Sequence, residues 1–155
     1  MTEETQAPGV VFNIQKIYVK DASYEAPNVP AVFLDQQAAP QVELRMDVQY
    51  TALNEGEGIY EVVLEITATT LSGDKTLFLA EAQQAGLFQI KDVPPDDLPK
   101  VLQITCPSIL LPFAREVLND MVSKGGFPQF LMSPVNFEAL YHQKEAGIKK
   151  RASQA

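Results

Sequence analysis

The side chains that could carry out chemistry in this chain are few and lie far apart. The lone cysteine, Cys106, is a potential nucleophile, but it precedes Pro107 in an apolar segment, where we expect a buried, inert thiol. His142 is the only histidine, so one chain cannot assemble a zinc site of the Cys and His type. No phosphate-binding loop, GxGxxG turn, GxSxG elbow or HExxH helix is present. We therefore predict a protein that is not an enzyme and needs no cofactor or metal. An enzyme that uses Cys106 or His142 is the opposing hypothesis.

Two carboxylates stand where a predicted strand ends. The segment 17–28 reads IYVKDASYEAPN, so an apolar alternation runs into Asp21 and Glu25 and stops at Pro27. No His, Cys or metal-ligand partner lies nearby in the sequence. This pattern favours a docking surface over a reaction centre, and a solvated face without a partner is the alternative.

The balance of charge limits which partners the chain can attract. Its 155 residues carry a formal net charge of −8, with 8 basic and 19 acidic side chains before position 144 and four basic and one acidic from there on. An acidic body repels nucleic acid and attracts basic protein surfaces. We predict a protein partner and no nucleic acid, although the charge could also serve solubility alone.

Length and composition indicate one globular domain in a reducing compartment. Apolar residues make up 46% of the chain, and a single cysteine cannot form an internal disulfide. No apolar run approaches the roughly 20 residues of a membrane span, and the first residues lack the features of a secretory signal. We expect a cytoplasmic protein without direct membrane insertion.

Four segments alternate apolar and polar residues with the period of two that is typical of strands. They cover residues 10–20, 41–53, 59–71 and 76–88. Residues 26–40 hold three prolines, which predicts a crossover loop with Phe33 and Leu34 in it. Short turns between the last three strands predict an antiparallel meander.

Helical patterns follow the strands. We predict a short helix through 96–103, an amphipathic helix from Pro107 to the stop at Gly125 and Gly126, and a last helix over 137–146 that Asn136 caps. Strands before helices indicate an α+β fold, a four-stranded antiparallel sheet with helices on one face. The domain is expected to span residues 10–146, with disordered ends at 1–9 and 147–155.

Several segments resemble the SecB family of export chaperones. They are 17–28, then YEVVL at 60–64, FLAE at 78–81, ITCPSILLPFARE at 104–116 and GFPQFLMSPVNFEALY at 126–141. The resemblance implies the same α+β fold, a homotetramer built as a dimer of dimers, and an ATP-independent holdase that binds unfolded precursor proteins and passes them to SecA, the translocation motor.

The resemblance also assigns roles to individual positions. Its SecA-binding surface falls on Asp21, Glu25, Leu79 and Glu81. Its client-binding groove falls on Phe33, Leu34, Val42, Leu44, Met46, Leu140 and Tyr141, and its oligomer interface on Ala80, Ala82 and Gln84. From the residues alone, the stripe at Val42, Leu44 and Met46 is typical of a core.

Three features depart from the family pattern: a basic tail, a polar continuation after Tyr141, and no tryptophan in the crossover loop. The polar residues His142 to Glu145 predict a shallower groove at that end. They also leave open a SecB-like chaperone dedicated to one client, such as an antitoxin of a toxin–antitoxin system.

Overall fold

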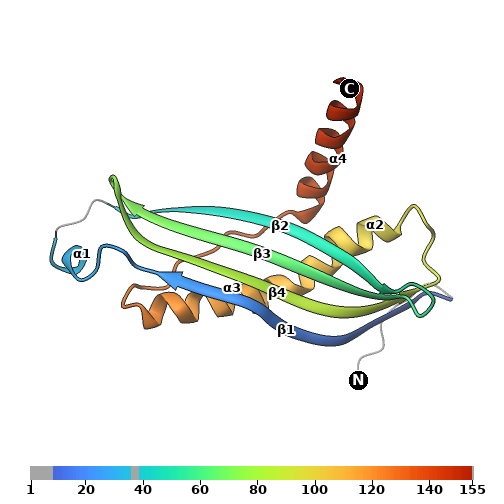
Figure 1. Cartoon of the computed structure of the whole chain (residues 1–155), viewed down its shortest axis with the longest axis horizontal. Helices are drawn as coiled ribbons and strands as arrows, with labels where there is room; N and C mark the ends of the chain where they lie inside the picture. Colours follow the sequence, from blue (N-terminus) through green and yellow to red (C-terminus); the bar gives the residue numbers. More distant parts are fainter. Residues whose placement is uncertain (1–8, 36–38, 155) are drawn as a thin grey trace.

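The computed structural model describes residues 9–35 and 39–154. The elements follow the order β1 (Val11–Glu25), α1 (Ala31–Leu34), β2 (Gln41–Asn54), β3 (Ile59–Ser72), β4 (Lys75–Lys91), α2 (Leu98–Lys100), a π-helical turn (Val101–Thr105), α3 (Cys106–Lys124) and α4 (Phe137–Gln154). The strands form one antiparallel sheet in the order β1-β4-β3-β2. The predicted α+β fold is confirmed, and α3 lies behind the sheet (Figure 1).

The topology places β1 and β2 at opposite edges of the sheet. Strands β2, β3 and β4 form the predicted meander, and the segment after β1 crosses to the far edge. That segment is not a loop throughout, because residues Ala31–Leu34 form the short helix α1. Strand β1 runs on through Asp21 to Glu25, five residues beyond the alternation that predicted it.

The core lies between the sheet and one face of α3. Side chains at a spacing of three or four residues along α3 are fully buried, as the amphipathic pattern predicted: Leu110, Ala114, Leu118 and Val122. They pack on even-numbered side chains of β3 and β4 such as Leu64, Ile66 and Phe88. This arrangement gives the sheet an inner face under α3 and an outer face toward solvent.

The two helices predicted over 96–124 are one continuous helical rod in the structure. The α-helical part, α3, begins at Cys106, within one residue of the predicted start at Pro107, but a π-helical turn joins it to the preceding segment without a gap. In this turn the amide of Cys106 donates to the Val101 carbonyl, five residues back. A wider turn relaxes the crowding that a proline ring causes in a regular helix.

This rod also bears on the membrane prediction. By length and composition, Leu98–Lys124 is long and apolar enough to cross a membrane, contrary to the sequence expectation. One of its apolar faces packs on the sheet through Leu102, Leu110 and Leu118. The core helix of a globular domain meets the same criteria, so length and composition do not by themselves make this rod a membrane span.

The last helix begins where predicted and ends later. Asn136 accepts a hydrogen bond from the amide of Ala139 at 3.0 Å, which confirms the cap. Helix α4 then continues to Gln154, beyond the predicted end near Ala146, and the disordered tail expected over 147–155 stays a prediction. This added stretch contains Lys149, Lys150, Arg151 and Ala152, residue types that favour helix. The N-terminal arm predicted over 1–9 lies outside the described residues except for Gly9.

Candidate functional site: a groove along the edge strand β2

The inner face of β2 continues beyond the cover of α3. Val48 is buried, while Val42 and Leu44 on the same face keep 38% and 37% of their surface exposed. Side chains of one strand face share a side because successive residues alternate. The apolar stripe that would ordinarily be core is therefore half uncovered, as the client-groove prediction requires.

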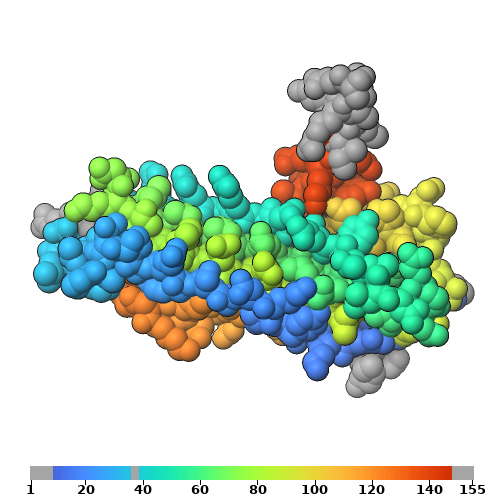
Figure 2. Space-filling view, in the orientation of Figure 1, coloured from blue at the N-terminus to red at the C-terminus, as the bar shows by residue number. Residues whose placement is uncertain are grey.

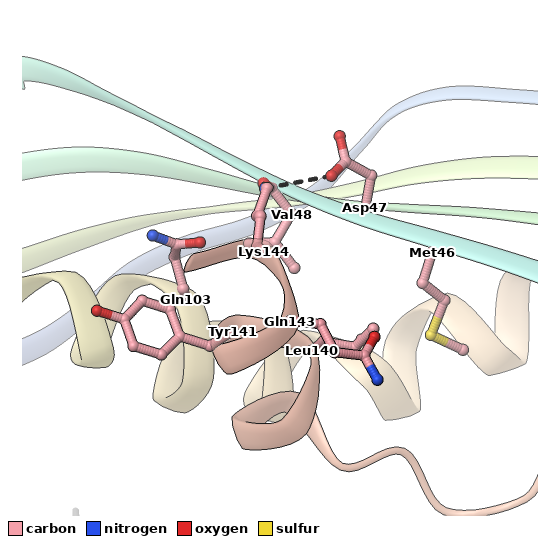
Figure 3. A pocket seen from close by; sticks show the side chains of 8 residues that line it. All are labelled: Met46, Asp47, Val48, Gln103, Leu140, Tyr141, Gln143 and Lys144. Atoms are coloured by element: carbon pink, nitrogen blue, oxygen red, sulfur yellow. Dashed lines mark hydrogen bonds and ion pairs between the residues drawn. The ribbon is translucent and has the colours of Figure 1, made fainter. Parts of the chain in front are cut away.

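The opposite wall comes from the segment after α3. Gly126, with φ of +89°, turns the chain at the end of α3, and an extended link then runs to Asn136. The start of α4 brings Leu140 and Tyr141 close to β2. Figure 3 shows Leu140 and Tyr141 beside Met46 and Val48 of that strand.

Three adjoining hollows line this wall, and we call them together the β2 groove. The first, about 500 Å³, lies between Val42, Leu44, Met46 and the link from Leu131 to Asn136. The second, about 270 Å³, shares Met46 and Leu140 with the first. The third, about 510 Å³, extends past Tyr141 to Tyr50 and Thr51. The structure thus brings five of the seven predicted groove residues together: Val42, Leu44, Met46, Leu140 and Tyr141.

The other two predicted groove residues lie elsewhere. Phe33 and Leu34 are on α1 and line none of the three hollows. The Phe33 ring packs on Phe127, with centroids 5.1 Å apart, and stays 48% exposed. Leu34 is 87% exposed. Their contribution to binding stays a prediction, as an apolar surface beyond the groove.

Sequence reasoning missed one polar groove residue, Gln103, and included a second, Lys144, only as part of the polar segment after Tyr141. Gln103 enters from the π-helical turn and Lys144 from α4, and both line the second and third hollows. The π-helical turn had no recognised sequence signal. Lys144 follows Leu140 by four residues, one helical turn, so its position near the groove could have been derived from that spacing.

The predicted docking residues gather on the outer face of the sheet. The register pairs Glu25 with Leu79, Ser23 with Glu81, and Asp21 with Gln83 across β1 and β4. Directly paired residues of an antiparallel sheet share a face. Asp21, Glu25, Leu79 and Glu81 therefore form one surface, which we call the β1–β4 patch. Figure 2 views the molecule from a side on which β1 is exposed along its length.

A hydrogen-bonded cluster stands beside this patch. The Tyr18 hydroxyl donates to Glu61 at 2.5 Å, and the Lys20 ammonium donates to the same carboxylate at 3.1 Å. The Tyr18 hydrogen bond, together with Lys20, lowers the pKa of Glu61 despite partial burial. Burial and the Glu61 carboxylate raise the pKa of Tyr18 to about 12. The cluster fixes β1 to β3 across β4.

The residues predicted for the oligomer interface lie inside the chain. Ala80, Ala82 and Gln84 are on the inner face of β4 and are at most 2% exposed. The Gln84 amide donates to the Tyr18 carbonyl at 3.1 Å. These residues have no surface for a direct contact with another chain, so any role in assembly passes through the helix packed on them.

The candidate catalytic residues occupy unrelated places. Cys106 is fully buried, and burial raises the pKa of its thiol to about 12, which fits the predicted inert role. His142 is exposed on α4 beside Glu138 and Glu145. Among the described residues, no group of three or more His, Cys, Asp or Glu side chains could hold a metal ion.

Comparison with known proteins agrees with this geometry. A family model for SecB, described as preprotein translocase subunit SecB, matches residues 3–147. A protein-export protein SecB of Thiobacillus denitrificans is 48% identical over 145 residues, which cover 94% of this chain and 93% of that protein. The protein-export protein SecB of Aromatoleum aromaticum is 44% identical over 156 residues, which cover 100% of this chain and 96% of that protein.

Among solved structures, the fold is similar to that of the SecB-like chaperone Rv1957 of Mycobacterium tuberculosis. That protein was solved with a peptide from the HigA1 antitoxin. The TM-score is 0.65 at 14% identity, and the match covers 81% of this chain and 91% of the other. At this identity the likeness shows the fold alone.

Proposed function

The chain belongs to the SecB family, and we propose on this premise that it is an ATP-independent holdase for unfolded secretory precursors, which it delivers to the SecA motor. The observation that supports this function is the β2 groove. Val42, Leu44 and Met46 leave apolar surface open along an extended strand. Such a surface suits apolar segments of many sequences, and the flexible side chain of Met46 adapts to different clients.

The energetics of such binding favour a particle with several grooves. Burying one apolar side chain gains about 1.5–3 kcal/mol, and ordering each client residue costs about 1–2 kcal/mol. These terms nearly cancel over a short segment. Several linked sites raise the affinity without demanding one sequence. These energies favour an oligomer with several grooves. On the family premise we propose that this oligomer is a homotetramer, a dimer of dimers, in the cytoplasm.

We assign SecA docking to the β1–β4 patch. Asp21 and Glu25 are exposed on the edge strand, and Glu81 accepts a hydrogen bond from Thr67 at 3.3 Å, which holds its carboxylate on the outer face. The patch lies on the face opposite to α3, so a motor bound there leaves the β2 groove free.

The experiment that tests the function measures particle mass and refolding on one sample. A slow-folding secretory precursor is diluted from denaturant into the protein without nucleotide. We expect light scattering to give the mass of four chains, and refolding to stop at near-stoichiometric amounts. A tetramer that leaves refolding unchanged would contradict the holdase function and keep the fold.

A pair of variants on one strand locates the site. Changing Val42→Thr and Leu44→Gln makes the groove floor polar without removing strand-forming shape, and we expect it to weaken the arrest of refolding. Glu43→Gln alters the outer face of the same strand and serves as the control. Equal arrest by both variants would place the clients outside the groove.

The second function considered, a chaperone dedicated to an antitoxin, is not favoured. The proteins that are 43–48% identical to this chain are export proteins, whereas the antitoxin-bound structure is 14% identical.

A further inference from the structure

Strand β2 has a free edge as well as an apolar face. It is the last strand of the sheet, so every second residue directs its backbone N–H and C=O away from β3. The Val48 carbonyl points outward, because it accepts a hydrogen bond from Lys144 of α4 at 2.8 Å. With the same alternation, Met46 and Tyr50 also direct their backbone groups outward. An extended segment that lies in the groove meets these groups.

Lys144 reaches over this edge to the outer face. Besides the Val48 carbonyl, its ammonium donates to the Asp47 carboxylate at 3.3 Å (Figure 3). Val48 faces the groove and Asp47 faces the other way. The ammonium thus covers the edge of β2 at the point where α4 approaches it.

The charges around Asp47 explain why a cation is held there. Asp47 pairs with Glu65 of β3 on the outer face, and like charges directly opposite each other repel. Gln83 donates to Glu65 at 3.0 Å and Gln49 donates to Asp47 at 3.3 Å, but both donors are neutral. Lys144 supplies the positive charge that this pair of carboxylates favours.

The contact also divides the groove. Lys144 lines both the second and the third hollow, so its side chain lies between Met46 and Leu140 on one side and Tyr50 on the other. In the part of the chain that the structure describes, the hydrogen bonds that join α4 to β2 both come from Lys144. Figure 1 shows the rest of α4 standing away from the sheet.

We propose that Lys144 is a latch: its ammonium holds the start of α4 on the edge of β2 and occupies the Val48 carbonyl that an extended client must pair with. This inference rests on the proposed function. A client segment that runs through all three hollows displaces the ammonium from Val48, after which Lys144 keeps Asp47 as its partner. The latch lowers the affinity for such segments and shortens the groove for others.

The test compares Lys144→Met with the natural protein. Methionine keeps the length, the apolar stem and the helix propensity of lysine and removes only the charged donor. The probe is a fluorescent 20-residue peptide of Val, Phe, Ser and Gln, with no ionisable side chain that could interact with Lys144. We expect binding about three- to tenfold tighter, the effect of losing one charged hydrogen bond that competes with the client.

A second measurement detects the latch without any client. Amide hydrogen exchange of the segment 137–147 is expected to be faster in Lys144→Met, because the hydrogen bonds from α4 to β2 are lost. Lys144→Arg keeps a charged donor and should restore the peptide affinity and the exchange rate toward those of the natural protein. Lys124→Met removes a lysine that is paired with Asp120 on α3, and it should change neither the peptide affinity nor the exchange rate of 137–147.

Each outcome decides the inference. Equal or weaker peptide binding by Lys144→Met overturns it, as does unchanged exchange of α4. A natural protein that binds neither the peptide nor a precursor would refute the proposed function instead. In that case the exchange comparison still reports whether Lys144 holds α4 on β2.

Discussion

Glu61 lies between a phenol and an ammonium on the outer face of the sheet. The hydrogen bonds from Tyr18 and Lys20 lower the pKa of this carboxyl, whereas burial, together with Glu61, raises the pKa of the Tyr18 phenol. A carboxyl with a lowered pKa stabilises the fold above its ordinary pKa, and this contribution is lost as the pH falls. A phenol with a raised pKa stabilises the fold below pH 10, and its contribution is lost as the pH rises toward about 12.

Replacing Tyr18 with Phe tests this pair of opposite pH dependences. We expect Tyr18→Phe to lower the free energy of unfolding by about 1–2 kcal/mol near pH 7, through the lost hydrogen bond to a charged group. The difference from the natural protein should shrink as the pH falls below 4.5, the ordinary pKa of a glutamate, and through the lowered pKa of Glu61. It should also shrink as the pH rises above 10. Urea unfolding at one protein concentration and several pH values measures it. Tyr50→Phe is the control at a half-exposed ring, and a difference that stays constant between pH 3 and pH 9 would contradict the linkage.

At the scale of elements, β1 and β4 build a surface that neither strand has alone. Asp21 and Glu25 come from one strand and Leu79 and Glu81 from the other, and the pairing of Glu25 with Leu79 places them on one face. A register shift between Val19 and Asp21 marks a bulge in β1 just before the patch. Bulges redirect side chains at sheet edges. The shift therefore sets which face the two carboxylates occupy.

Charge reversal at the β1–β4 patch tests its role in docking. We expect Asp21→Lys with Glu25→Lys to weaken SecA binding at least about a hundredfold, because like charges then meet across the contact. Isothermal calorimetry measures the affinity, and client binding should persist. The control, Glu55→Lys with Asp96→Lys, makes the same change in net charge far from the patch. SecA affinity unchanged by the first pair would refute the docking assignment.

At the scale of the whole molecule, α3 covers one face of the sheet and leaves apolar surface on its own far side. Phe113 is 46% exposed, and Ile109 and Val117 beside it on the helix are partly buried. A row of this kind on the outside of a core helix is typical of an interface between chains. It is a candidate surface for the proposed tetramer, and Ala80, Ala82 and Gln84 lie on the inner face of β4, under the helix that carries it.

A charge placed on this row should reduce the mass of the particle. We expect Phe113→Asp to shift the light-scattering mass from four chains to two or one, since an unpaired carboxylate is costly to bury in an interface. Leu53→Asp alters another exposed apolar residue, near the turn between β2 and β3, and should leave the mass unchanged. A mass of four chains for Phe113→Asp would place the interface elsewhere.

The spacing of apolar residues, every second residue in strands and every three or four in helices, was enough to predict most elements from sequence. The alternation in β2, β3 and β4 and the apolar stripe of α3 predicted both the meander and the helix that covers it. The errors concern helix boundaries, where a single proline or glycine was taken to mark the start or the end of a helix. The two predicted helices before Lys124 are continuous, because a π-helical turn bridges the segment before Pro107. Helix α4 continues past Gly147, because neighbouring residues favour helix.

The fold class, the family resemblance and the shared strand face of Val42, Leu44 and Met46 can be predicted from sequence, because they depend on local spacing and on ordered motifs. The packing of the folded chain is needed to show that this face is half open, that Ala80, Ala82 and Gln84 are internal, and that Lys144 lies on the edge of β2. Burial and contacts across 96 residues depend on which elements pack together, and a local pattern carries no information about a partner so distant in the chain.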